Sequence, residues 1–100
     1  MQMSILHLVN KSPYERDSLD TATDYMVDGD AMLLIEDGVY AAMSGGKAAS
    51  KISGMKVSVL GPDLAARGIS EEKLVDGVTV VDYAGFVDLV ESNDKVQSWL

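Results

Sequence analysis

Cysteine is absent from this chain of 100 residues. Without a thiol there can be no disulfide, no thiolate ligand for zinc and no cysteine nucleophile. Histidine occurs once, as His7, so a metal site built from several imidazoles is excluded as well. We therefore expect neither a bound metal nor another cofactor.

Basic residues are scarce: eight lysines and arginines stand against sixteen aspartates and glutamates, which gives a formal net charge of −8. No stretch of the chain gathers several basic residues. A protein that binds DNA or RNA needs a positive surface to displace counterions from the phosphates, and an anionic membrane makes the same demand. We therefore expect no direct contact with nucleic acid and no binding to a membrane surface.

Long hydrophobic runs are also lacking. The apolar run near the N-terminus, Ile5–Val9, is short and follows no basic segment, unlike the apolar region of a signal peptide. No stretch approaches the roughly 18 apolar residues that a membrane-spanning helix requires. These absences predict a cytoplasmic location.

What the chain does have is a large hydrophobic fraction, 47%, which suffices for one folded domain over residues 1–100. The most informative segment begins with the apolar run Ala31–Ile35 and ends in the acidic turn Glu36–Gly38. A short apolar run with such a boundary predicts a strand buried on both faces, as in parallel sheets covered by helices. Ligands and partners of these sheets meet the carboxyl ends of the strands, where Asp37 and Gly38 would lie.

Strands and helices are predicted to alternate along the chain. The expected strands cover residues 4–10, 31–35, 56–60 and 78–81, and the longer expected helices cover residues 15–27 and 84–91. This order predicts right-handed crossovers and a mostly parallel sheet, hence an α/β fold. Ser12, Pro13 and Glu15 form a capping-box pattern at the first helix. The segment Gly61–Asp63 predicts a turn after the third strand.

Two residues invite a catalytic interpretation. His7 would serve as a general base, or its ring would bond a carboxylate or a backbone group within its strand. We favour the second interpretation, because no serine or cysteine nucleophile motif accompanies this histidine. Asp37 would either cap the helix that follows it, which we favour, or contact a partner.

Further residues are candidates for contacts. Asp63 and Arg67 lie four residues apart on a predicted helical turn, so they can form a surface ion pair of about 0.3–0.5 kcal/mol. Arg67 is also a candidate interface anchor, since arginine is enriched in binding hot spots. The apolar end Trp99–Leu100 predicts docking, either onto the chain's own core or onto another chain.

Five segments together resemble the TusB/DsrH family, small subunits of bacterial sulfur-relay complexes. These segments read LHLVNKSPYERDSL, LLIEDGVYAA, VLGPDLAARGI, VVDYAGFVDL and VQSWL, in that order. The resemblance implies a small three-layer DsrE-like domain, with flanking helices and a mostly parallel sheet of about four to five strands.

The resemblance also implies partners. Family members assemble with two paralogous subunits, TusC/DsrF-like and TusD/DsrE-like, as a dimer of heterotrimers, and an isolated chain is compatible with a homo-oligomer. A cysteine of the TusD/DsrE-like subunit carries sulfur as a persulfide. The sulfur passes toward 2-thiouridine at the tRNA wobble position, which we favour here, or serves dissimilatory sulfur oxidation in sulfur-oxidising bacteria.

Some family members carry a cysteine in the first helix, where this chain aligns Ala22. Because persulfide chemistry needs a thiolate, this chain cannot hold transferred sulfur. We therefore predict a non-catalytic subunit that supports the relay through its contacts. The candidate interface residues are Asp37, Gly38, Tyr40, Asp63, Arg67, Trp99 and Leu100. The alternative is a stand-alone α/β enzyme or ligand binder that uses His7 and Asp37 in a crevice at the strand ends.

Overall fold

The fold is built on one five-stranded sheet in which every pairing is parallel. The structure, a computed structural model, describes residues 4–14 and 16–99. The strands are β1 (Ile5–Val9), β2 (Ala31–Leu34), β3 (Val57–Leu60), β4 (Thr79–Val81) and β5 (Lys95–Trp99). They lie in the order β4-β3-β2-β1-β5, so the chain steps from β1 to β4 and then crosses back to the other edge.

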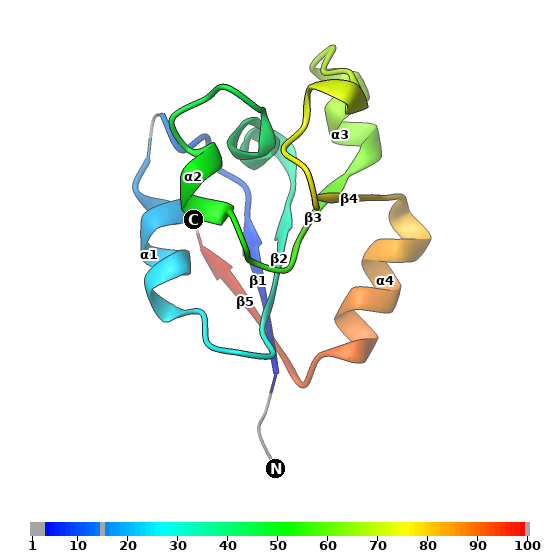
Figure 1. Cartoon of the computed structure of the whole chain (residues 1–100). Coiled ribbons are helices and arrows are strands. Elements are labelled where there is room, and N and C mark those ends of the chain that lie inside the picture. Colours follow the sequence, from blue (N-terminus) through cyan, green and yellow to red (C-terminus); the bar gives the residue numbers. More distant parts are fainter. Residues whose placement is uncertain (1–3, 15, 100) are drawn as a thin grey trace.

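Helices connect the strands and form two outer layers. They are α1 (Ser18–Tyr25), α2 (Ala49–Ile52), α3 (Gly61–Ala66) and α4 (Tyr83–Ser92), with 3-10 segments η1 (Glu36–Ala42) and η2 (Glu71–Lys73). Figure 1 shows α1 and α2 on one side of the sheet and α4 on the other. The three-layer α/β fold expected from the sequence is therefore confirmed. No helix among the described residues is long and apolar enough to cross a membrane.

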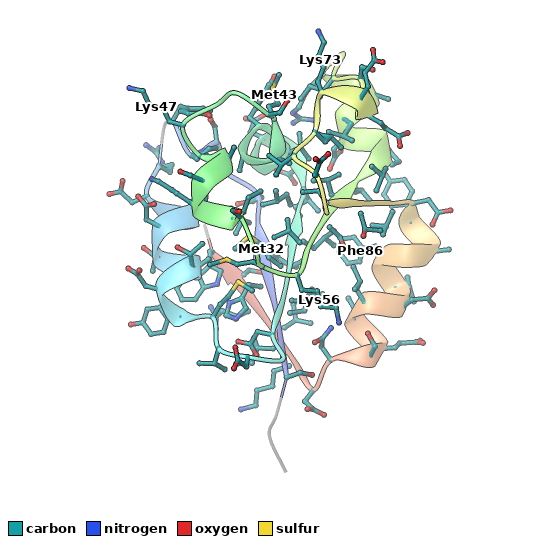
Figure 2. All side chains as sticks on the ribbon, viewed as in Figure 1. Met32, Met43, Lys47, Lys56, Lys73 and Phe86 are labelled. Atoms are coloured by element: carbon teal, nitrogen blue, oxygen red, sulfur yellow. The ribbon has the colours of Figure 1, made fainter. Side chains whose placement is uncertain are left out.

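The strand β2 lies at the centre of the core, and all four of its residues are buried. Met32 and Leu34 belong to the large cluster beneath α1, η1 and α2. Ala31 and Leu33 belong to a smaller cluster that packs against Phe86 and Leu89 of α4. Figure 2 shows Met32 and Phe86 on opposite sides of the sheet. An unbroken apolar run is required here because successive side chains face the two layers in turn.

Two local predictions are wrong. The first helix begins at Ser18, not near residue 15, because the Ser12 hydroxyl accepts the Tyr14 N–H at 3.2 Å and forms a separate turn. The capping-box partner Glu15 lies outside the described residues. After β3 there is no turn, because α3 begins at once at Gly61 with a proline in its first turn. Proline fits there because the first helical N–H groups have no partner within the helix.

The strand β5 was not predicted, although the chain does fold back at this end. Its residues pair in parallel with β1, from Ile5 opposite Lys95 to Val9 opposite Trp99. In this register Val96 faces the α4 side together with Leu6, while Trp99 faces the α1 side together with His7. The strand is an edge strand, and its first four residues are exposed.

Candidate functional site

Arg67, one of the predicted contact residues, meets both Asp37 and Asp63 at the carboxyl ends of β2 and β3. Arg67 lies just after α3, and its Nε donates to the Asp37 carboxylate at 2.9 Å. Its Nη1 donates to the Asp63 backbone carbonyl at 3.3 Å and lies 4.0 Å from the Asp63 carboxylate. The predicted ion pair between Asp63 and Arg67 is therefore confirmed. Arginine suits this position because its planar fork reaches several oxygens at once.

The prediction that Asp37 caps the helix after it is wrong. Asp63 has this role instead. Asp37 is the second residue of η1, and Ile35, which precedes this segment, makes no side-chain capping hydrogen bond. Instead the Asp63 carboxylate, which comes from α3, accepts the Glu36 N–H at 2.7 Å. Glu36 has a φ of 49°, in the left-handed region that a non-glycine residue seldom adopts. Because Asp63 holds this backbone from another segment, the sequence around Asp37 alone gave no sign of it.

The other two strand-end candidates are packing residues in this chain. Gly38 is buried, and a Cβ on it would lie 2.1 Å from the Val9 carbonyl oxygen. Tyr40 is half-buried and packs against the large core cluster. Contact of either residue with another chain remains a prediction.

We predict that Asp63→Ala lowers the free energy of unfolding by about 1–2 kcal/mol, because the Glu36 amide loses a charged acceptor. Asp37→Ala should cost less than about 1 kcal/mol, because its ion pair is half exposed to water. Urea titrations of both variants measure the difference. Equal losses would contradict the assignment of the cap to Asp63.

A second group of polar residues surrounds His7, which is buried on the α1 side of the sheet. Its Nδ1 lies 2.9 Å from the Trp99 indole Nε1, and its Nε2 lies 3.0 Å from the Asp30 carboxylate. An indole N–H can only donate, so Nδ1 accepts and the imidazole carries its proton on Nε2. The prediction that the ring bonds a carboxylate is confirmed, and the imidazole has no free acceptor for general-base catalysis.

Asp30 was not singled out from the sequence, although it is buried and central to this group. Besides the His7 ring, its carboxylate accepts the backbone N–H groups of Ile5 at 3.0 Å and Val27 at 3.2 Å. Burial opposes the charged form, yet the hydrogen bonds from His7, Ile5 and Val27 outweigh it and hold the pKa of Asp30 below its usual value. The one available signal was an aspartate placed directly before a fully apolar strand.

Trp99 docks onto the chain's own fold. Its ring stacks on His7 with centroids 6.0 Å apart, and it lies 5.2 Å from the ring of Tyr25 on α1. A hollow of about 360 Å³ adjoins these three rings and is also lined by Ile5, Thr21 and Gln97. Leu100 lies outside the described residues. A contact of Trp99 with another chain remains a prediction.

Ala22, where the resemblance implies a cysteine in some family members, is fully buried in the large core cluster. The described residues contain no group of three or more histidine, aspartate or glutamate side chains arranged to hold a metal ion. The two polar groups thus hold elements of the fold together: one ties η1 to α3, and the other ties β5 to β1 and to the segment before β2.

Comparison with known proteins identifies the family. The family described as "DsrH like protein" matches residues 11–96. The chain belongs to this DsrH-like family. Protein TusB of Pectobacterium parmentieri is 37% identical over 97 residues, which cover 95% of this chain and all of the relative. Protein TusB of Escherichia coli (strain K12 / DH10B) is 30% identical over the same shares of the two chains. The resemblance seen in the sequence is therefore confirmed.

The fold of this DsrH-like chain also has solved counterparts. The crystal structure of the ychN protein from E. coli superposes with a TM-score of 0.79, covers 97% of this chain and 99% of its own, and is 23% identical. Protein Tm0979 from Thermotoga maritima superposes with a TM-score of 0.68, is 27% identical and covers 88% of this chain and 92% of its own. These likenesses support the α/β architecture.

Proposed function

We propose that this chain is a non-catalytic subunit of a heteromeric sulfurtransferase, assembled with TusC/DsrF-like and TusD/DsrE-like subunits in the cytoplasm. The observation that carries the proposal is a DsrH-like sequence without a single cysteine. A persulfide relay passes sulfur between thiolates, so a chain without thiols contributes contacts to the relay and no sulfur carrier. We further propose that the sulfur serves 2-thiolation of the tRNA wobble uridine, with dissimilatory sulfur oxidation as the alternative pathway.

The exposed face of α4 supports assembly with other subunits. Tyr83, Val87 and Val90 recur at helical spacing and are 64%, 52% and 36% exposed. Val96 of β5 is 43% exposed and faces the same side of the sheet. No residue of α4 is buried, whereas α1, η1 and α2 on the other face each contain buried residues. Apolar side chains gathered on one surface are typical of a protein contact site. We propose this face as one contact, with Asp37 and Arg67 contributing to another.

The rival function is a stand-alone enzyme that uses His7 and Asp37. The two side chains have separate partners: His7 bonds Asp30 and Trp99, whereas Asp37 bonds Arg67. The hollow beside His7 offers room for a small molecule, but both ring nitrogens of the histidine are occupied. A general base needs a free acceptor within reach of the substrate proton, so this geometry favours the subunit.

Co-expression with the TusC-like and TusD-like subunits of the same genome tests the proposal directly. We expect the three chains to elute together in size-exclusion chromatography. After incubation with a persulfide donor, intact-mass analysis should find a gain of about 32 Da, one sulfur atom, on a partner and none on this chain. A stable adduct on this chain, or turnover of a substrate by the chain alone, would contradict the proposal.

We predict that Val87→Glu weakens binding to the partner subunits by roughly tenfold or more, because it puts a charge into an apolar contact. Isothermal titration or a competition pull-down measures the change. Val27→Glu is the matched control, since Val27 is 65% exposed but lies in the turn before β2. Equal affinities of the two variants would exclude α4 as the contact, while joint elution would still support the complex.

A further inference from the structure

The side chain of Trp99 is held by one polar contact whose chemistry depends on the charge of its partner. The indole N–H donates to His7 Nδ1 at 2.9 Å, and the ring is otherwise held by stacking on His7 and contact with Tyr25. This contact exists only while Nδ1 carries a lone pair. A proton on Nδ1 would set two N–H groups against each other, so the ionised imidazole cannot accept from the indole.

Asp30 stabilises the ionised imidazole in this buried site. Its carboxylate bonds the opposite ring nitrogen, Nε2, at 3.0 Å, and this bond persists and strengthens when the ring becomes positively charged. Protonation of the imidazole therefore removes only the hydrogen bond from Trp99. The arrangement has two states: neutral His7 bonded to both Asp30 and Trp99, and charged His7 bonded to Asp30 only.

The side chains packed around His7 come from three neighbouring elements, and few of them are titratable. From α1, Thr21 and Tyr25 line the adjoining hollow, and from β5 Gln97 lies opposite His7 in the sheet. From β2, Met32 is the register neighbour of His7. Among these described residues only Asp30 and Tyr25 are titratable. The pKa of Asp30 lies below its usual value, so its carboxylate stays charged when a solution is acidified from pH 8 to pH 5.

We propose that protonation of His7 releases the Trp99 indole from its docked position between β1 and α1. The release opens the hollow beside Ile5 and Thr21 and frees the carboxyl end of the edge strand β5. Acidification thus exposes a large apolar ring at one edge of the sheet, and return to neutral pH docks it again. The device makes the surface presented by the C-terminal strand dependent on pH.

Trp99 is the single tryptophan of the chain, so its fluorescence reports on docking directly. Between pH 8 and pH 5 we expect the emission maximum to move to longer wavelength in the intact chain. The population of undocked indole should rise roughly fivefold, the factor that corresponds to the net contribution of one ordinary hydrogen bond. An emission spectrum that stays constant across this range would overturn the proposal.

Two substitutions of His7 separate its two contacts. In His7→Asn the amide oxygen can take the place of Nδ1 as acceptor and does not titrate, so Trp99 should stay docked at every pH. In His7→Gln the amide reaches toward Asp30 but leaves the indole N–H without an acceptor, so the undocked population of Trp99 should be raised roughly fivefold already at pH 8. A pH transition in His7→Asn equal to that of the parent chain would show that another group controls the indole.

The unsubstituted chain provides a second measurement that does not depend on the folding of the variants. In NMR spectra the indole N–H resonance of Trp99 and the imidazole C–H resonances of His7 can be followed in one titration. We expect both to change with the same midpoint, with the indole signal moving toward the position of a free indole. An indole resonance that does not shift, or that shifts with a different midpoint, would contradict the coupling.

Discussion

Asp30→Asn should lower the free energy of unfolding by about 3–5 kcal/mol, the largest loss that we expect from any single isosteric change in this chain. The carboxylate of Asp30 accepts three hydrogen bonds, from His7 Nε2 and from the backbone of Ile5 and Val27. The amide of asparagine has only one acceptor oxygen, and its NH₂ group would face a donor. Guanidinium titration at pH 7, followed by circular dichroism, measures the loss.

Asp28→Asn is the matched control, because Asp28 lies in the same turn but is exposed. This variant should change the free energy of unfolding by less than about 0.5 kcal/mol. A similar stability of the two variants would mean that the carboxylate of Asp30 does not link the elements as its contacts imply.

The contribution of Asp30 to the free energy of unfolding also depends on pH. Its pKa is lower in the folded chain, mainly because the hydrogen bonds from His7, Ile5 and Val27 outweigh the effect of burial. The stabilisation is therefore complete above the unfolded-state pKa, about 3.9, and is lost as the pH falls through the lower folded value. The parent chain should lose stability on acidification below about pH 4, and Asp30→Asn should show a smaller loss there. An equally steep loss in Asp30→Asn would assign the acid sensitivity to other carboxylates.

The strands that depend on local pattern could be predicted from the sequence, and the strand that depends on distant partners could not. The apolar run around Met32 identifies a strand by itself, because both of its faces meet a helical layer. The segment Lys95–Trp99 alternates weakly and is largely exposed, so only its pairing with β1 makes it a strand. The start of α1 was missed for a related reason, since the Ser12 hydroxyl bonds a nearby turn instead of the helix.

The same distinction applies to the candidate site. The sequence predicts that Asp37 lies at the carboxyl end of a strand, but the bond that joins it to Arg67 was not among the predictions. The capping of Glu36 by Asp63 spans 27 positions, and the bond between His7 and Asp30 spans 23. Such pairings are set by the register of the strands and by the loops between them, and no residue pattern within either segment specifies them.

Gly38→Ala should lower the free energy of unfolding by at least about 3 kcal/mol, at the upper end of the cost of overfilling a packed site. The Cβ would lie 2.1 Å from the Val9 carbonyl oxygen and 2.9 Å from the Val9 carbonyl carbon. Both are backbone atoms at the end of β1, and that carbonyl oxygen already accepts the Ile35 N–H at 3.0 Å. The obstacle cannot be relieved by rotating a side chain, so η1 must move away from the sheet. Thermal unfolding and urea titration measure the loss.

Gly29→Ala is the informative control, because it tests a different cause of destabilisation. A Cβ at Gly29 would meet no atom within 4 Å, but the residue has a φ of 95°. Its substitution should therefore cost only the backbone strain of the left-handed region, about 1–2 kcal/mol. If close approach of η1 to β1 is what the sequence requires at position 38, Gly38→Ala must be clearly the less stable variant. Equal losses would mean that η1 can yield, and that the glycine after Asp37 is not needed to bring the strand end against β1.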